Sequence, residues 1–448
     1  MSSQNRVMKR PVLALALVCA GIPLCAETVR PKARPAAGEM VARAAVGAFA
    51  VTIAPTRSLR PEMRPKALSA VASSHGSDPG FQAWIKSFRP RAARAGVHGA
   101  VFDRAFAGVR FDPEVVAKDS KQSEFTKPIW DYLDTAASDA RVATGREMMV
   151  KHGRLLRQLE EQYGVDRQII LAIWGMETNF GKFRGSNNVV QSMASLAYDG
   201  RRRGFFEGEL IAALKILQAG HTAPENMKGS WAGAMGHTQF MPSSFNALAV
   251  DFTGDGRRDI WGEDPADALA STANYLAKSG WVTHMPWGVE VQLPERFDFA
   301  LVGTAEKMPS DWARLGVRDI KGNPVRDYGA ARLLLPAGHQ GAAFLVFKNF
   351  RVIKRYNAAD AYALGVGHLG DRILGLPPIT GEWPRHDRAL TVSERKELQR
   401  RLTAAGYDTR GVDGRLGPNS IAALRRWQSA RGLVPDGFAS FGTLQRLQ

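Results

Sequence analysis

The sequence predicts an α+β protein that is mainly α, with one large domain and a small helical domain at its C-terminus. Apolar residues recur at helical spacing over most of the stretch from residue 81 to 275. Between residues 287 and 350, short β-type runs alternate with Gly and Pro turns, and a Pro-rich linker near residue 380 precedes a final helical stretch. The 448 residues, 45% hydrophobic and 23% charged, are sufficient for two or three domains with sizeable cores.

Residues 1–26 have the pattern of a secretory signal peptide. Three basic residues precede an apolar run from Pro11 to Ala20, and Ala20 or Ala26 offers a small residue for cleavage. The apolar run is too short to span a bilayer comfortably. We therefore expect export, with a periplasmic location for the mature chain. Residues 27–79, with six prolines among Ala and Arg, are expected to form a poorly ordered tether.

Both cysteines, Cys19 and Cys25, lie within this leader. The mature chain is thus expected to carry no cysteine, which excludes disulfides and a catalytic thiol. Cys25 is a candidate for lipid attachment. The residues before it, Ile22 to Leu24, lack the small side chains that bacterial lipoprotein processing uses, so a lipid anchor is not expected.

The chain is strongly basic. Its formal charge of +17 falls to +14 when the leader, with three basic and no acidic residues, is removed. In an exported protein this excess indicates an anionic surface, either membrane or a cell-wall polymer with peptide carboxylates. The sequence contains no helix-turn-helix, zinc-finger or RNP motif, so nucleic acid is not an expected partner. Peripheral contact with a membrane stays open, and no protein partner is indicated.

The large domain is expected to extend over residues 80–380. Its helices are bounded by Gly, Asp or Pro signals, and its strands lie between Gly and Pro turns. Helices are predicted over residues 154–163, 167–176, 205–217, 267–278 and 358–373, and strands over 289–293, 332–335 and 343–347.

The linker Leu376–Pro384 leads to a small domain over residues 387–448. Helices are predicted over residues 393–404, 419–430 and 443–447, with Pro418 placed to start the second. The sequence therefore predicts a separate three-helix domain.

Glu177 is the most informative single residue. It follows Asp166, Ile170, Ile173 and Trp174 along one face of the predicted helix, at the end of an apolar stripe. A carboxyl group buried there loses hydration, so its pKa should rise, and it becomes a general acid suited to cleaving a glycosidic bond. The spacing supports equally a buried Glu paired with Arg or Lys for structure.

The segment 228–245 has the composition of a sugar-binding loop. Its three glycines let backbone approach a ligand closely. Ser230 and Gln239 supply hydrogen bonds, and Trp231 and Phe240 supply flat surfaces. A tight Gly-Ala turn between core helices explains this stretch equally well.

Three ordered motifs identify a family. Glu-Thr-Asn-Phe-Gly (177–181), Gly-Ala-Met-Gly-x-x-Gln-Phe-Met-Pro-Ser-Ser (233–244) and Arg-Tyr-Asn (355–357) closely resemble the lytic murein transglycosylase B family, over about residues 81–380. The resemblance implies a lysozyme-like fold and cleavage of the MurNAc-β-1,4-GlcNAc bond of peptidoglycan glycan strands, with no cofactor required.

The resemblance also implies roles for individual residues. It makes Glu177 the acid/base and Phe240 a wall of the site, whereas His237 stands where an aromatic residue is expected. The alternative for each tyrosine is a core ring with its hydroxyl satisfied. The positions that match residues facing the glycan or its peptide are Ser230, Gln239, Tyr275, Tyr356, Asn357, Tyr362, Tyr132, Arg201 and Arg202.

A single carboxyl group determines the expected mechanism. Retaining and inverting glycosidases use two carboxyl groups, and no second acidic residue lies within the first two motifs. Glu177 can act alone if the C6 hydroxyl of the sugar attacks C1 and forms a 1,6-anhydro ring. A hydrolytic muramidase, which would need a second acid, and a non-catalytic wall-binding scaffold are the alternatives.

Residues 251–259 resemble the start of an EF-hand loop. Oxygen donors stand at positions 1, 3, 5 and 9, but position 12 is Gly262 in place of the usual Glu. The family resemblance implies that a later acid can close the loop. The sequence supports equally a structural calcium site and an Asp-Gly turn held by hydrogen bonds. The candidate ligands are Asp251, Thr253, Asp255, Asp259 and Asp267.

The small domain resembles the three-helix peptidoglycan-binding domain. The matching stretches include Leu398–Leu402, Val412–Pro418 and Asp436–Gly437, whereas Phe438–Gly442 departs from the usual Gly-Pro turn. The resemblance implies that this domain tethers the enzyme to its substrate. A stabilising appendage is the alternative.

Overall fold

The computed structural model describes residues 78–121 and 127–447. The predicted signal peptide and nearly all of the predicted tether lie outside the described residues. No helix in the described part of the chain has the length and apolar character needed to cross a membrane.

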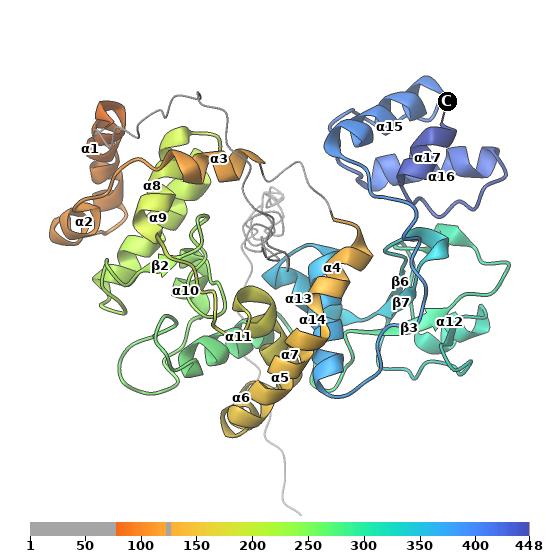
Figure 1. Ribbon diagram of the computed structural model, residues 1–448, viewed down its shortest axis with the longest axis horizontal. Helices are drawn as coiled ribbons and strands as arrows, with labels where there is room; N and C mark the ends of the chain where they lie inside the picture. Colours follow the sequence, from red (N-terminus) through yellow and green to blue (C-terminus); the bar gives the residue numbers. More distant parts are fainter. Residues whose placement is uncertain (1–77, 122–126, 448) are drawn as a thin grey trace, which may run out of the picture. The chain divides into compact units, whose positions relative to one another are not determined.

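Helices form most of the large domain (Figure 1). Several begin with proline in their first turn, where the missing N–H costs nothing: Pro79, Pro242 and Pro309 are examples. The helices are α1 (Pro79–Arg94), α2 (Gly99–Phe106), α3 (Pro113–Lys121), α4 (Ile129–Ala136), α5 (Asp139–Lys151), α6 (Gly153–Tyr163), α7 (Arg167–Thr178), α8 (Val189–Asp199), α9 (Arg203–Gln218), α10 (Pro242–Leu248), α11 (Ala266–Lys278), α12 (Pro309–Arg314), α13 (Lys348–Tyr356) and α14 (Asp360–Ile373).

Helix α7 lies in the centre of the large domain. It packs against α5, α6, α11 and α14 (Figure 1), and every residue from Ile169 to Thr178 is buried. The prediction of a single apolar face was therefore too narrow, because the surrounding helices enclose the second half of α7 on all sides. The carboxyl group at its end is consequently shielded from water.

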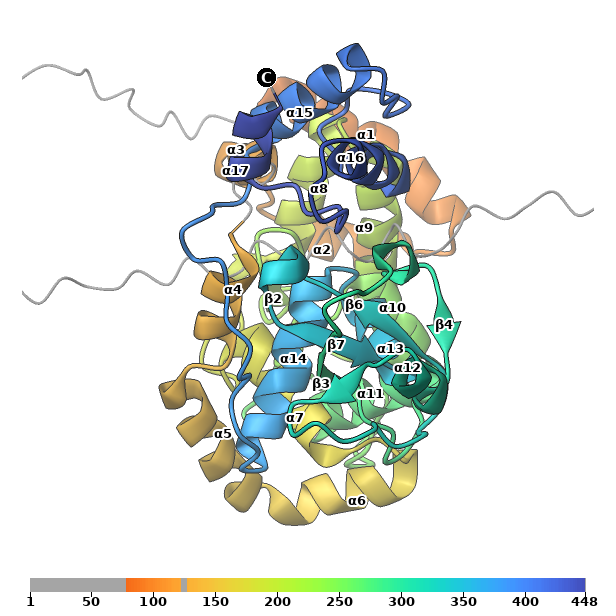
Figure 2. The ribbon, with the colours of Figure 1, turned by 90° about the vertical axis from the view of Figure 1, so that its right-hand side faces the viewer.

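A five-stranded antiparallel sheet has the order β4-β6-β7-β3-β5. Figure 2 labels four of these strands, β3, β4, β6 and β7. The central strand β7 is buried at every position, whereas β6 alternates between buried and more exposed residues. The sheet covers a separate apolar core that includes Trp312 and Phe347. The strands are β3 (Gly288–Gln292), β4 (Glu306–Lys307), β5 (Arg318–Asp319), β6 (Ala331–Leu334) and β7 (Ala343–Val346), and a two-stranded ladder joins β1 (Asn187–Asn188) to β2 (Lys228–Gly229).

Helix α13 is absent from the sequence-based prediction. Its polar residues Lys348, Arg351 and Lys354 obscure an apolar face, on which Phe350 and Ile353 are fully or almost fully buried. The predicted helix over 358–373 is α14, which begins only at residue 360, after a short extended break. Packing of α13 against α11 and α14 stabilises a helix that the local pattern did not indicate.

The C-terminal domain contains α15 (Val392–Ala404), α16 (Pro418–Ala430) and α17 (Phe441–Arg446). Thr391 and Glu394 form a reciprocal capping box at the start of α15. Leu398, Leu402 and Trp427 contribute to a core that belongs to this domain alone.

Candidate active site

Glu177 lies in the last turn of α7 and is only 3% exposed. Directly after this turn, Asn179 and Phe180 adopt positive φ angles of 51° and 58°, so the chain reverses at the helix end. The Tyr362 hydroxyl donates a hydrogen bond of 2.6 Å to Oε1 of Glu177. Burial raises the pKa of Glu177 to about 8, and the bond from Tyr362 opposes part of that rise. Glu177 is therefore protonated at neutral pH.

The groups around Glu177 distinguish a buried general acid from a buried Glu that forms a structural ion pair. Within residues 78–121 and 127–447, Glu177 forms no ion pair with Arg or Lys. The titratable groups that interact with it there are the phenols of Tyr132, Tyr356 and Tyr362. The environment is that of a buried general acid and lacks the cation that a structural ion pair requires.

Tyr132 lies on α4, which packs against α14. Its pKa is raised, first by burial and then by the nearby Glu177. Tyr362 stacks on Tyr356 with the ring centroids 6.5 Å apart and the planes at 4°. Tyr362 thus contacts the carboxyl group directly, and Tyr132 and Tyr356 are near enough to interact with it electrostatically.

Two of the predicted tyrosines have their hydroxyl groups satisfied by backbone. Tyr356 donates to the carbonyl of Thr238 and Tyr275 donates to the carbonyl of Arg355, each at 2.6 Å. Phe240 meets both rings edge-on, with centroids 5.9 Å away. These three side chains form a buried aromatic cluster beneath the loop 230–240.

Ser230 and Gln239 stand on that loop. The Ser230 hydroxyl accepts a bond of 3.0 Å from the backbone N–H of Ala234. The Gln239 amide donates to the carbonyls of Gly236 and Arg184, at 2.9 and 3.2 Å, and its own φ is 55°. Both side chains therefore brace the loop.

The glycines of this loop allow close packing of protein against protein. A Cβ atom at Gly236 would collide with the carbonyl oxygen of Ile260, and one at Gly233 with Met193. The close neighbours are other parts of the chain, as expected for a tight turn between packed elements.

His237 occupies the position at which an aromatic residue was expected. It is 4% exposed, and Trp174 donates a bond of 3.1 Å to its Nδ1. Its Nε2 lies 2.7 Å from the carbonyl oxygen of Gly262, so the proton belongs on Nε2. Burial is the main cause of its lowered pKa. A neutral His237 therefore links α7, the helix that carries Glu177, to residues 251–262, which we call the Asp-rich loop.

Three predicted polar residues already have protein partners. Arg201 and Arg202 both form ion pairs with the buried carboxylate of Asp119 on α3, the second at 3.3 Å. Asn357 is 2% exposed and its side chain accepts a bond of 3.1 Å from the N–H of Ala359. It therefore stabilises the short turn between α13 and α14.

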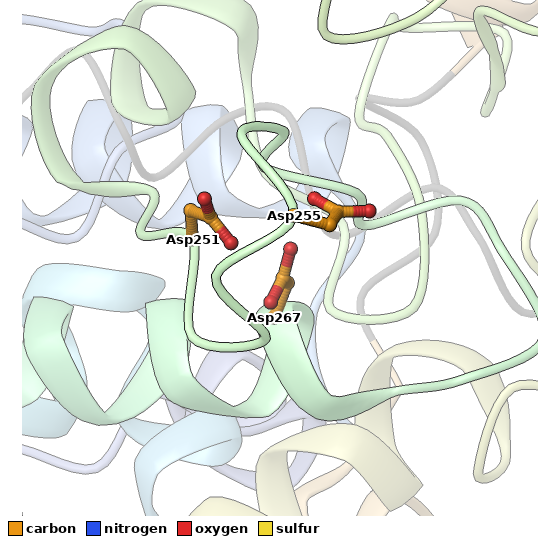
Figure 3. Close-up of side chains that lie close together, drawn as sticks. All are labelled: Asp251, Asp255 and Asp267. Atoms are coloured by element: carbon orange, nitrogen blue, oxygen red, sulfur yellow. The ribbon is translucent and has the colours of Figure 1, made fainter.

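Three carboxylates meet in the Asp-rich loop (Figure 3). One oxygen from each of Asp251, Asp255 and Asp267 lies within 4.8 Å of the others. Asp259 does not belong to this group, and its carboxylate accepts hydrogen bonds from the backbone N–H groups of Trp261 and Gly262. Thr253 donates its hydroxyl to Asp251 at 3.4 Å.

Backbone hydrogen bonds also hold this loop. Asp267 accepts bonds from the N–H groups of Phe252, Thr253 and Asp259 at 2.9–3.1 Å. Asp251 accepts two more from within the loop. The donor set is of the hard oxygen type that calcium prefers, and the loop is closed by hydrogen bonds as well.

Comparison with models of protein families identifies the family of the chain. Residues 80–371 match the family model described as Transglycosylase SLT domain, and residues 391–447 match a peptidoglycan binding domain. The chain belongs to the transglycosylase SLT family. Members of this family are lytic murein transglycosylases, lyases that act on peptidoglycan.

Among curated proteins, this family member is similar to membrane-bound lytic murein transglycosylase B of Escherichia coli strain K12. The two are 36% identical over 225 residues, which is 49% of this chain. The match spans 60% of the length of the Escherichia coli protein.

Solved structures confirm the fold class. SltB3 of Pseudomonas aeruginosa, in complex with NAG-anhNAM-pentapeptide, has a TM-score of 0.80 and 49% identity, covering 82% of this chain and 99% of its own. The Escherichia coli lytic transglycosylase SLT35, in complex with calcium, has a TM-score of 0.56 and 29% identity, covering 67% and 95%. The predicted mainly helical, lysozyme-like α+β class is therefore correct.

Sequence reasoning missed the supporting residues Trp174, Arg184 and Asp119. Arg184 donates to the carbonyls of Trp261 and Gly262 at 2.9 and 2.6 Å, and so holds the loop beside His237. No local pattern marks such residues, because their partners lie elsewhere in the chain.

Proposed function

We propose that this protein is a lytic transglycosylase that cleaves the MurNAc-β-1,4-GlcNAc bond of peptidoglycan without using water. The observation that carries the proposal is the isolated, protonated carboxyl group of Glu177, with its pKa of about 8. In the described part of the chain its interacting titratable groups are phenols, and no second carboxylate is among them. A glycosidase that uses water needs a second carboxyl group within about 5–9.5 Å of the first.

The reaction proceeds through one proton donor that becomes the base. Glu177 donates its proton to the glycosidic oxygen, and the bond between that oxygen and C1 of MurNAc breaks. The Glu177 carboxylate then takes the proton from the C6 hydroxyl of the same sugar, whose oxygen forms a bond to C1. GlcNAc leaves with a free hydroxyl, MurNAc ends as its 1,6-anhydro form, and Glu177 regains its proton. Intramolecular attack makes activation of water unnecessary.

Tyr362 supports the charged state of Glu177 in this cycle. The hydroxyl that lies 2.6 Å from Oε1 donates to the carboxylate formed after proton transfer. We infer that Tyr132, Ser230 and Gln239 border the sugar, in keeping with their places beside Glu177 and on the loop 230–240.

The remaining predicted groove residues are assigned supporting roles. Tyr275, Tyr356 and Phe240 are buried, and the hydroxyl groups of both tyrosines are bound to backbone, which supports a role beneath the groove. Asn357, Arg201 and Arg202 hold α14 and α3 in place through their observed partners.

Digestion of purified sacculi tests the proposal. The released muropeptides are expected to be one water lighter than hydrolysis products and to end in 1,6-anhydro-MurNAc. Glu177→Gln should abolish their release while leaving binding to sacculi intact. Reducing ends would favour a muramidase, and an inactive wild-type protein that still binds sacculi would favour a scaffold.

We infer that the chain is exported to the periplasm and that its C-terminal domain holds it at the wall. The leader pattern and the match of residues 391–447 to a peptidoglycan binding domain support this inference. Truncation after residue 386 should weaken sedimentation with sacculi and leave turnover of soluble glycan strands unchanged. Retained sedimentation would point to a stabilising appendage.

We also propose that Asp251, Asp255 and Asp267 hold a structural calcium ion. The ion would tie the loop 251–259 to α11 and would supply no step of the reaction. The convergence of three carboxylate oxygens supports this site, as does the calcium complex of the related SLT35. Calcium should raise the melting temperature of the wild-type protein and not that of Asp255→Asn. Equal melting with calcium and with chelator would favour the hydrogen-bonded turn.

A further inference from the structure

An open cavity of about 840 Å³ lies where the C-terminal end of α9 meets the Asp-rich loop. Its walls are formed by Arg104 of α2, by residues of the stretches 217–228 and 257–262, and by Arg184 and Gly185. Its volume is in the range typical of ligand pockets, about 300–1,000 Å³. The reaction proposed for Glu177 does not use it.

Three cations line this cavity without a counter-ion: Arg104, Lys228 and Arg257. Each is an exposed residue, and none forms an ion pair with any residue in 78–121 or 127–447. Two acids also line the cavity, Glu225 and Asp259, but the Asp259 carboxylate accepts two backbone N–H bonds at 2.8–2.9 Å. Glu225 also forms no ion pair within the described residues, so three unpaired cations face one unpaired acid. The net charge of these exposed groups is positive, and we call this feature the cationic cavity.

The cationic cavity adjoins the loops of the active site. Lys228 lies two residues before Ser230, at the start of β2, which precedes the loop 230–240. Arg184 and Gly262 belong to the cavity wall, and both contact His237, which in turn is hydrogen-bonded to α7. The wall of the cavity is thus connected through His237 to α7, the helix that carries Glu177.

We propose that the cationic cavity binds carboxylate groups of the peptidoglycan stem peptide. This inference rests on the proposed function, because it takes peptidoglycan as the substrate. The glycan chain itself carries no charge where the reaction occurs, whereas the peptide attached to MurNAc carries carboxylates. Arg and Lys side chains form charge-assisted hydrogen bonds with such groups, and three unpaired cations in one cavity match a branch with several carboxylates.

Kinetics on two substrates test this assignment. Arg104→Gln, Lys228→Gln and Arg257→Gln are combined, and 1,6-anhydro products are measured from peptide-bearing strands and from strands stripped of peptide by an amidase. KM for peptide-bearing strands should rise about three- to tenfold with kcat unchanged, as expected for three partly exposed charge contacts. KM for stripped strands should change by less than about twofold.

A matched control removes the same charge elsewhere. Three exposed cations form no ion pair within the described residues: Lys151, Arg154 and Arg157. Their combined replacement by Gln should leave KM unchanged for both substrates. Amidation of the peptide carboxylates should reduce the preference of the wild-type protein for peptide-bearing strands, and added salt should do the same.

Several outcomes would overturn the assignment. An unchanged ratio of the two KM values would do so, as would an equal rise for both substrates. Loss of binding to phosphatidylglycerol vesicles with an unchanged KM ratio would assign the cavity to a membrane instead. Absence of 1,6-anhydro products from the wild-type protein would refute the proposed reaction. Calorimetric binding of soluble peptide-bearing muropeptides by Glu177→Gln, with and without the cavity substitutions, would then still test the cavity.

Discussion

Replacement of Tyr362 by Phe isolates the contribution of one hydrogen bond to the proposed acid. The Tyr362 hydroxyl donates to Oε1 of Glu177 at 2.6 Å, and both side chains are buried. The substitution removes this donor and keeps the ring that stacks on Tyr356. The neutral form of Glu177 loses little, whereas its carboxylate form loses its donor.

The magnitude follows from the charge on the acceptor. A hydrogen bond to a charged group contributes about 1.5–3 kcal/mol, which corresponds to about one to two pKa units. Since the bond from Tyr362 lowers the pKa of Glu177 toward about 8, its loss should raise that pKa further. The carboxylate also forms during the reaction, so kcat should fall about 10- to 100-fold.

The assay is kcat as a function of pH, measured by release of 1,6-anhydro muropeptides. Glu177 must be protonated to act as the acid, so wild-type activity should decline as pH rises through about 8. In Tyr362→Phe the decline should occur at higher pH. Tyr328→Phe, which keeps the ring that packs on Phe347 in the sheet core, is the control and should match the wild type. An alkaline decline that stays in place or moves to lower pH in Tyr362→Phe would refute the reasoning.

Three further substitutions follow from the same structure. Because burial raises the folded-state pKa of Glu177 from 4.5 to about 8, keeping it buried costs nothing below pH 4.5 and progressively more up to pH 8. Glu177→Gln should thus raise the free energy of unfolding by on the order of 3 kcal/mol at pH 7 and by little at pH 4. Urea unfolding measures this difference, and an equal gain in stability at both pH values would contradict the prediction. Gly236→Ala should lower the free energy of unfolding by about 2–4 kcal/mol, because φ is +68° and the new Cβ would meet a backbone carbonyl. The control, Gly208→Ala on the open face of α9, should raise the free energy of unfolding by about 0.5–1 kcal/mol. Equal effects of the two glycine substitutions would show that the close approach at residue 236 is unimportant. His237→Phe should cost about 1–3 kcal/mol, because it leaves the buried indole N–H of Trp174 without its acceptor, whereas the carbonyl of Gly262 keeps Arg184 as a donor. An unchanged melting temperature would show that the bond from Trp174 to His237 contributes nothing.

The sequence by itself determined those elements whose signals are local. Helical periodicity placed α6, α7 and α9 to within about two residues, and turn residues bounded β3, β6 and β7. The same patterns identified Glu177 as a carboxyl group at a buried helix end, since the spacing of apolar residues shows which side of a helix avoids water.

Only the tertiary structure decided what surrounds Glu177. Tyr362 lies 185 residues away in the chain, and Tyr132 comes from yet another helix, so no local pattern could pair them with the carboxyl group. Packing also formed α13 despite its polar sequence, turned the loop glycines toward protein and gave His237 two partners from distant segments. The periodicity of a sequence records that a side chain is buried, whereas its partners depend on how distant elements pack together.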